Sequence, residues 1–311
     1  MILNVPEHLL KSHQFAPSMR KIIIYSLALF CYGHLYGQNF FDDVDETVIR
    51  ADNSDRWIVP DAYRTLTLEL DELADYLGKA PNRNATETLT LAVPMPDNTI
   101  EEFEIQFSPI MDEALSAQLP AVSTYFGRGI TNPSATIYLD LTPKGFHGMI
   151  LRGTGGAIFI DPYYNNNTQY YLSYYKADFD ATANHETWSC ELSTSKSDTG
   201  NLRSDTELPA PSSGSRSSAP VTLKTYRLAV AATAEYTSFH GGTVNAGLEA
   251  IVTAINRVSG IYETELGIKF ELVANNNLLV YTNTATDPYT CLLYTSPSPR
   301  DATLSRMPSS A

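Results

Sequence analysis

Residues 243–272 read TVNAGLEAIVTAINRVSGIYETELGIKFEL, and this stretch decides the fold. Apolar side chains recur at steps of three and four along its first two thirds, which predicts an amphipathic helix that begins after Thr243. Gly267 predicts the end of that helix, because glycine readily adopts the left-handed conformation that closes a last turn. The next residues alternate apolar and charged side chains up to Leu272, as in a strand. The apolar positions of the helix are Val244, Leu248, Ile251, Val252, Ile255, Val258 and Tyr262.

A further strand precedes this helix. Residues 221–232 (VTLKTYRLAVAA) predict a strand whose buried positions are Leu223, Tyr226, Leu228 and Val230. A strand, a helix and a strand in this order are the opening of an α/β domain. We expect this domain to occupy residues 221–290 and to be truncated.

Upstream, residues 63–192 predict a β-rich domain. Leucines alternate with polar residues from Leu66 to Leu70, and residues 71–77 predict a short helix. The turn signal Pro96-Asp97-Asn98 predicts a hairpin between the segments before and after it. Further short alternating segments predict one antiparallel sheet, and Gly153–Gly156 predicts a hairpin turn within it. These later segments are 136–141, 148–151, 157–160 and 170–175. The fold class expected for the whole chain is α+β.

The remaining segments are weakly patterned. Residues 38–62 are acidic and predict a lead-in to the β-rich domain. Residues 193–220 contain many Ser, Thr, Pro and Gly and few apolar side chains, so they cannot bury enough surface to order themselves. We expect residues 193–220 to be a flexible, protease-accessible linker between the two domains.

The N-terminal region predicts export. Residues 19–37 combine a basic start, an apolar run over 22–32 and small residues before Gln38, which is the pattern of a signal peptide. The apolar run is too short for a transmembrane anchor. Residues 1–18 are then expected to be upstream sequence read through from an early start codon. The predicted location is secreted or on the cell surface, with no stable membrane span after signal removal.

The C-terminal residues 291–311, CLLYTSPSPRDATLSRMPSSA, resemble translated sequencing adapter. We therefore expect the true protein sequence to stop near Thr290. Cys31 lies in the predicted signal and Cys291 in the adapter-like segment, which leaves Cys190 as the one cysteine of the genuine mature part. Cys190 has no partner there for an internal disulfide.

Composition narrows the function. The 311 residues include 35 acidic and 21 basic side chains, a net charge of -14. A phosphate backbone would repel such a surface, so general nucleic-acid binding is not expected. With 43% hydrophobic residues the chain is of ordinary globular composition, which excludes collagen-like, coiled-coil and wholly disordered proteins.

Two segments carry a resemblance to a known family. TYRLAVAATAEYTSFHGG (225–242) and AINRVSGIYETELGIKFELVANNNLLVYTNTATDPYT (254–290) resemble the start of the catalytic domain of bacterial reprolysin-like (adamalysin-type, metzincin) secreted zinc metalloproteases. LDLTPKGFHGMIL (139–151), IFIDPYY (158–164) and YYLSYYKADF (170–179) resemble the prodomain of the same proteins. The resemblance implies that 63–192 is a prodomain and that 221–290 begins a zincin-type catalytic domain.

The chemistry implied by the resemblance is absent from this sequence. The family binds Zn²⁺ through three histidines of a His-Glu-x-x-His motif and a later Gly-x-x-His, and the glutamate takes a proton from the zinc-bound water that attacks the peptide bond. No two histidines here are four residues apart. His185-Glu186 begins like the motif, but Ser189 stands where the second histidine is needed. We expect no catalytic and no zinc-ligating residue in this chain, and we expect the fragment to be inactive.

The other histidines have structural interpretations. His147 lies in the prodomain-like strand region, between two predicted strands, and is expected to be a structural residue. His240 lies in the Gly-rich turn FHGG before the long helix and is expected to be a turn or packing residue.

Cys190 is a candidate inhibitory thiol. In some metalloprotease zymogens a prodomain thiolate occupies the fourth zinc position, and Cys190 lies after the last prodomain-like strand, where this role is possible. Its surroundings, Trp188-Ser189-Cys190-Glu191-Leu192, lack the usual Pro-Arg-Cys-Gly style. A disulfide to a cysteine further downstream and an inert thiol remain alternatives.

The sequence thus predicts a fragment of a secreted zinc metalloendopeptidase zymogen, whose partners in full-length form are zinc and protein or peptide substrates. The alternative is a secreted non-enzymatic surface, adhesion or binding module. The rest of the reading frame distinguishes the two, since a zinc-binding motif past Thr290 is expected for the protease alone.

Overall fold

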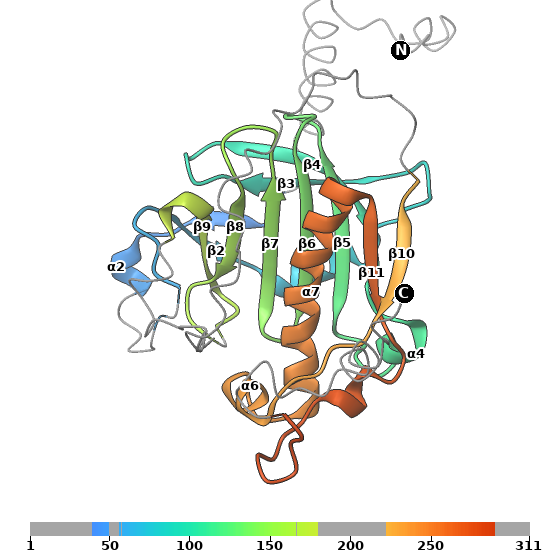
Figure 1. Ribbon diagram of the computed structural model, residues 1–311. Coiled ribbons are helices and arrows are strands. Elements are labelled where there is room, and N and C mark those ends of the chain that lie inside the picture. The colour runs from blue at the N-terminus through green and yellow to red at the C-terminus, as the bar shows by residue number, and fades with distance from the viewer. Residues whose placement is uncertain (1–38, 50–55, 57, 166, 180–221, 290–311) are drawn as a thin grey trace, which may run out of the picture.

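The computed structural model describes residues 39–49, 56, 58–165, 167–179 and 222–289. Its largest unit is a nine-stranded antiparallel sheet with the order β1-β2-β9-β8-β7-β6-β5-β4-β3 (Figure 1). Consecutive strands from β3 to β9 are neighbours, as expected for a meander of hairpins. The strands are β1 Phe41–Asp43, β2 Arg64–Leu68, β3 Leu89–Pro94, β4 Ile100–Phe107, β5 Ser123–Gly129, β6 Thr136–Thr142, β7 Gly145–Leu151, β8 Ile158–Pro162 and β9 Tyr170–Tyr175.

The predicted turns of this sheet are confirmed. β3 pairs with β4 in register Leu89↔Ile105, and Asn98 at their turn has a φ of 66°, a conformation that asparagine tolerates. Gly155 and Gly156 also have positive φ, and they connect the antiparallel pair β7–β8 as a hairpin. The β-rich character expected of this region is therefore present.

The sheet is curved around its main core. β9 reaches β3, because Ser173 Oγ donates a hydrogen bond to the carbonyl of Pro94 at 2.9 Å. Helix α3 (Leu70–Leu77) buries Leu73 and Leu77 in the same core, at the predicted position. The core also contains Leu66 from β2, among residues of almost every strand. One face of the sheet is thus filled by its own residues.

A second, smaller unit follows. β10 (Lys224–Leu228) and β11 (Ile268–Leu272) form a parallel pair, and α7 (Val244–Leu266) connects them after the short helix α6 (Ala234–Phe239). Thr243 caps α7, since its Oγ accepts a hydrogen bond from the amide of Ala246 at 3.1 Å. Gly267 ends the helix with a φ of 66°. The strand–helix–strand order and both predicted ends of the helix are confirmed.

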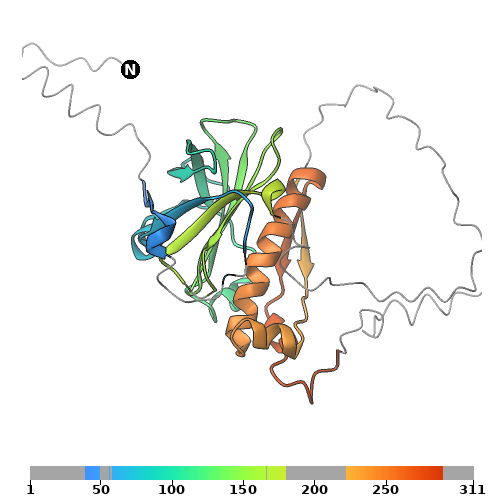
Figure 2. The ribbon, with the colours of Figure 1, turned by 90° about the vertical axis from the view of Figure 1, so that its left-hand side faces the viewer.

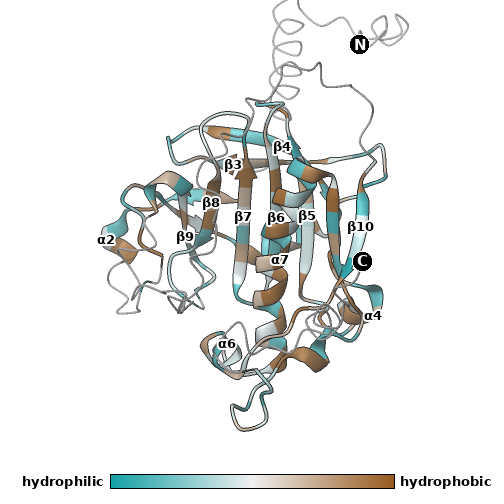
Figure 3. Cartoon of the chain, in the orientation of Figure 1, coloured by the Kyte–Doolittle hydropathy of each residue, from teal (hydrophilic) through white to brown (hydrophobic). Residues whose placement is uncertain are grey.

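Several sequence expectations need correction. Leu223 and Tyr226 were expected to be buried, but they are 39% and 51% exposed. Within the part of the chain that the structure describes, β10 pairs with β11 alone, so little packs against its side chains; Figure 3 shows β10 largely hydrophilic. The acidic lead-in expected over 38–62 contains β1, which pairs with β2, and the short helix α2 (Glu46–Ile49).

The two units pack against each other through α7. The helix lies between the nine-stranded sheet and the β10–β11 pair (Figure 2). Helix α4 (Glu113–Ser116), which the sequence did not predict, lies beside the C-terminal end of β11 (Figure 1). No described helix is long and apolar enough to cross a membrane.

Candidate functional site

The outer face of the nine-stranded sheet presents polar side chains to α7. Successive side chains of a strand point to opposite faces, so the residues between the core positions of β6, β7 and β8 point outward. On β6, Ile137 and Leu139 are in the main core whereas Tyr138 and Asp140 face the other way. The same alternation places Asp161 of β8 on the outer face. Both aspartates are nearly inaccessible, at 1% and 2% exposure.

The matching face of α7 is a stripe of polar and small residues. Residues three or four apart share one helix face. The stripe contains Thr253, Asn256, Arg257, Gly260 and Thr264, and each contacts the outer face of the sheet or would do so if it carried a Cβ. The apolar face of the same helix packs on the β10–β11 side. Helix α7 is therefore buried on two faces of different chemistry.

Arg257 and Asp161 form the central ion pair of this contact. Arg257 donates to Asp161 Oδ1, and Tyr174 of β9 donates its hydroxyl to Asp161 Oδ2 at 2.9 Å. Burial, the largest single influence, would lower the pKa of Arg257, but Asp161, Tyr174 and Asp140 together outweigh it, so the pKa is raised. Burial, assisted by Asp161, raises the pKa of Tyr174. The two side chains are buried as a hydrogen-bonded pair, so neither is left without a partner.

Asp140 forms a second polar contact with the helix. Thr253 donates its hydroxyl to Asp140 Oδ2 at 2.6 Å, and Asn256 donates its side-chain amide to Oδ1 at 3.4 Å. From the sheet itself, His147 Nδ1 of β7 lies 3.2 Å from Oδ2 without an aligned hydrogen bond. The Asp140 carboxylate thus accepts hydrogen bonds from two side chains of α7, Thr253 and Asn256.

The C-terminal half of α7 is held by shape and by a second ion pair, Arg83–Glu263. Glu263 accepts two hydrogen bonds from the guanidinium of Arg83, one of them at 2.9 Å. Arg83 also lies over the ring of Phe126, with 3.8 Å between its Cζ and the ring centroid. Gly260 lies against Tyr138 so closely that a Cβ there would stand 2.7 Å from the ring. Helix and sheet therefore approach as closely as a glycine permits.

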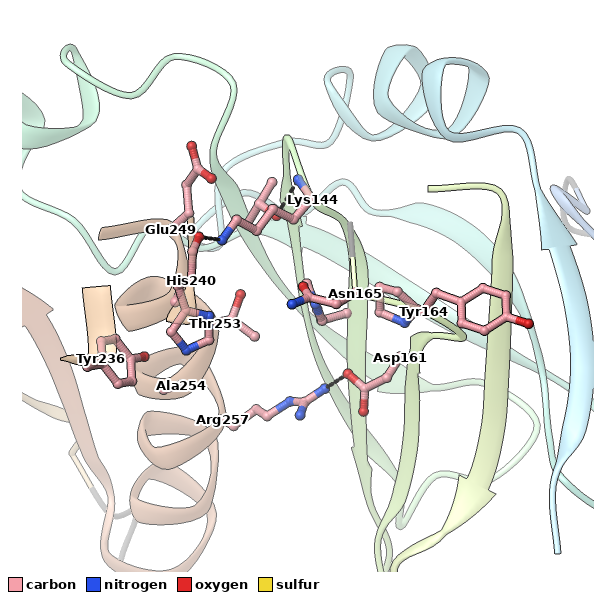
Figure 4. Close-up of a pocket in the computed structure, with 14 residues that line it drawn as sticks. Lys144, Asp161, Tyr164, Asn165, Tyr236, His240, Glu249, Thr253, Ala254 and Arg257 are labelled. Carbon is pink, nitrogen blue, oxygen red and sulfur yellow. Dashed lines mark hydrogen bonds and ion pairs between the residues drawn. The ribbon is translucent and has the colours of Figure 1, made fainter. Parts of the chain in front are cut away.

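A cavity of about 230 Å³ lies near the N-terminal end of this contact (Figure 4). It lies between the β6–β7 turn, which supplies Lys144, and α6 with the start of α7, which supply His240 and Glu249. Lys144 Nζ donates to the backbone carbonyl of His240. Burial and the nearby Lys144 lower the pKa of His240 to about 4, and burial raises the pKa of Glu249. Both shifts follow from placing these groups between two packed layers.

Residues 108–122 join the two units as a strap. The amide of Leu272 in β11 donates to the carbonyl of Ile110 at 2.7 Å, and the amide of Asp112 donates to the carbonyl of Leu272 at 2.9 Å. The strap therefore pairs with the free edge of β11. One apolar cluster includes residues of the strap and of the small unit: Ile110, Met111, Leu115, Leu119 and Val122 with Ala232, Leu248, Ile251, Val252, Leu272 and Val280.

The candidate residues from the sequence occupy different places. Cys190 and His185 lie outside the described residues. His147 is on β7 beside Asp140, and His240 follows α6 in the turn before α7, with its ring centroid 4.4 Å from that of Tyr236. Sequence reasoning missed the polar stripe of α7, although its threonine, asparagine, arginine and glycine recur at helical spacing.

The described residues do not fit a zinc ion. Among them, no three His, Cys, Asp or Glu side chains come together as metal ligands. Their histidines are His147 and His240, which belong to different units and both line the cavity, but neither is part of such a group of three. The contact between the sheet and α7 is an interface between two parts of one chain.

Comparison with known proteins agrees with the small unit. Residues 222–308 match the model of the metallo-peptidase family M12B, reprolysin-like. The match begins just before β10 and includes α6, α7 and β11, and it continues into the segment that resembles adapter sequence. No curated protein matches the chain. The small unit is therefore similar to a metallopeptidase domain, a class of hydrolases.

Proposed function

We propose that this chain is the precursor region of a secreted zinc metalloendopeptidase, in which residues 63–192 are the prodomain and 221–290 begin the catalytic domain. The observation that carries the proposal is the family match over 222–308, which coincides with the strand–helix–strand unit β10–α7–β11. The signal-like residues 19–37 support export.

Peptide hydrolysis belongs, in this proposal, to residues outside this sequence. The family is zinc-dependent, whereas the described residues offer no metal-binding cluster and the whole sequence has no two histidines four residues apart. No catalytic step is assigned to any residue here. The predicted product of these 311 residues alone is an inactive protein.

The role proposed for the β-rich domain is to fold and hold the beginning of the catalytic domain. Three contacts support this role: the buried pair Asp161–Arg257, the Asp140 cluster, and the strap over residues 108–122. A prodomain that contributes to the core of its catalytic domain can control when that domain is released. Cys190 remains a candidate for zinc-directed latency in the same precursor.

The experiment is to express the complete gene and to measure zinc content and casein hydrolysis, with and without a chelator. We expect one zinc-binding site and chelator-sensitive hydrolysis after removal of the prodomain, and neither from residues 1–311 alone. A complete reading frame without a His-Glu-x-x-His motif, or chelator-resistant hydrolysis, would contradict the proposal. In the first case the non-enzymatic binding module is the better interpretation.

A further inference from the structure

We propose that residues 39–179 are a separable binding module whose partner is the α7–β11 unit, and that the two stay bound after the chain between them is cut. This inference rests on the proposed function, and it names the surface by which the proposed prodomain recognises the catalytic domain. Three features of the contact support it: a shared apolar core, a strap that pairs with β11, and polar and steric contacts that select one partner.

The first step is that the two units share a core. Leu115 and Val122 of the strap are buried in one cluster with Leu248 and Val252 of α7 and Leu272 of β11. Burial of apolar surface is the main favourable term in association, and it does not depend on an intact peptide link. Separation would expose both halves of this cluster at once.

The second step is that the strap completes a sheet. β11 pairs with β10 on one side, and on the other side it pairs with the strap through Ile110 and Asp112. Addition of an extended segment to a sheet edge is a common mode of peptide recognition, in which the backbone supplies affinity. Lys269 of β11 also donates to Ser108 Oγ at 3.0 Å.

The third step is that the polar contacts select one partner. Asp161 is 2% exposed and Arg257 crosses from the helix to reach it, as Figure 4 shows. A buried charge without its partner is unfavourable, so a surface with buried Asp140 and Asp161 rejects a helix that lacks the matching donors. Gly260 adds a steric requirement, because a larger residue there would collide with Tyr138.

The test cuts the chain without changing either surface. A recognition sequence for a site-specific protease is inserted between Gly200 and Asn201 of the full chain, which carries an N-terminal affinity tag placed after the predicted signal. After cleavage at neutral pH, we expect the untagged C-terminal fragment to stay with the tagged fragment through size-exclusion chromatography and washing. Elution of two separate, folded fragments would overturn the proposal.

A matched pair of variants tests the recognition surface. Arg257→Met removes the charge that reaches Asp161, and we expect the C-terminal fragment to dissociate on the order of tenfold faster or more. Arg152→Met is the control, since Arg152 pairs with the buried Glu101 within the sheet and does not contact α7. Equal acceleration by both variants would refute the assigned surface.

Two controls distinguish a loss of binding from a loss of folding and from a failure of the proposed function. Circular dichroism of each uncut variant shows whether it is folded. If Arg257→Met does not fold, the pair Asn256→Ala and Glu265→Ala is compared instead, because Asn256 contacts Asp140 while Glu265 is exposed on the same helix. Binding is measured without any peptidase assay, so failure of the fragments to stay together is distinguishable from failure of the proposed function, which shows in the zinc and casein measurements.

Discussion

Gly260 is the residue at which helix and sheet come closest. A Cβ at this position would stand 2.7 Å from Cγ and Cδ2 of the Tyr138 ring, near the root of a buried side chain that cannot swing away. Replacing glycine by alanine inside a helix normally stabilises a protein by about 0.5–1 kcal/mol. A loss of stability in Gly260→Ala would therefore indicate the close contact with Tyr138, and a gain in stability would indicate its absence.

We predict that Gly260→Ala lowers the free energy of unfolding. Overpacking against Tyr138 costs about 1–3 kcal/mol, and the higher helix propensity of alanine offsets part of that cost. Urea unfolding followed by circular dichroism measures the change. Glu265→Ala, on the exposed side of α7, is the control and should be nearly neutral. A stabilised Gly260→Ala variant would show that Tyr138 does not limit the approach of the helix.

His240 gives the interface a dependence on pH. Burial and the neighbouring Lys144 lower its pKa to about 4 from an unfolded value near 6.5. Between these values the unfolded state binds the proton and the folded state does not, so stability falls as the pH drops from about 6.5 toward 4. Glu249, whose pKa is raised by burial, has the opposite sign, because protonation then favours the folded state.

We predict that His240→Gln removes part of the acid sensitivity. The groups that line the same cavity, Lys144, Glu249, Asp161, Arg257 and His147, are unchanged in the variant. Because these groups are common to both proteins, the difference in acid sensitivity reports on His240 together with its coupling to Lys144. Urea midpoints at pH 7 and pH 5 should fall more in the parent than in the variant. An equal fall would mean that His240 is not buried near Lys144.

At the scale of single residues, the sequence predicted the ends of a helix better than the contacts between distant side chains. Thr243 and Gly267 were predicted as the ends of the long helix because capping depends on neighbours in the chain. The pairing of Arg257 with Asp161 could not be predicted, since it joins positions 96 residues apart. Nothing local to either residue specifies that contact.

At the scale of elements, α7 shows that the burial of an apolar helix face can be predicted from sequence, whereas the burial of a polar face cannot. Its apolar face follows from hydrophobic periodicity and packs on the β10–β11 side. From the sequence alone, the polar face of α7 is indistinguishable from a face exposed to solvent. Only its contact with the outer face of the nine-stranded sheet shows that it is buried. Val258 and Leu266, in contrast, are apolar and 40% and 59% exposed, so periodicity alone did not decide burial either.

Helix α4 was missed because four residues carry too little periodic signal. Its Leu115 is completely buried in the core that the strap shares with the small unit. We predict that Leu115→Ala destabilises the protein by about 2–5 kcal/mol and loosens the small unit first. Hydrogen exchange of the β11 amides should accelerate more than that of the β6 amides.

Leu73→Ala is the comparison for this variant. Leu73 is equally buried, but in the main core of the nine-stranded sheet. A cavity there should accelerate exchange in the sheet at least as much as in β11. If both variants gave the same exchange pattern, the strap would not be a distinct support of the small unit.

At the scale of the whole molecule, the antiparallel sheet and the strand–helix–strand unit could be predicted because both are built from local patterns. Their packing against each other could not, since it depends on which outward residues of β6 and β8 face which residues of α7. The family match over 222–308 covers the small unit and does not extend to the β-rich domain. The interface is therefore known from geometry alone.

The order in which a protease cuts the intact chain depends on which cleavage sites the fold covers. Trypsin cuts after Lys and Arg, and residues 193–220, the predicted linker, contain Lys196, Arg203 and Arg216. Arg83 and Arg257 lie instead in ion pairs between the two units, and cleavage beside them requires the units to open. We predict that brief digestion at neutral pH cuts the linker first, and that mass spectrometry of early products finds ends at these three positions. Early cuts after Arg83 or Arg257 would mean that the interface opens before the linker is cut, and the sheet would then not protect α7.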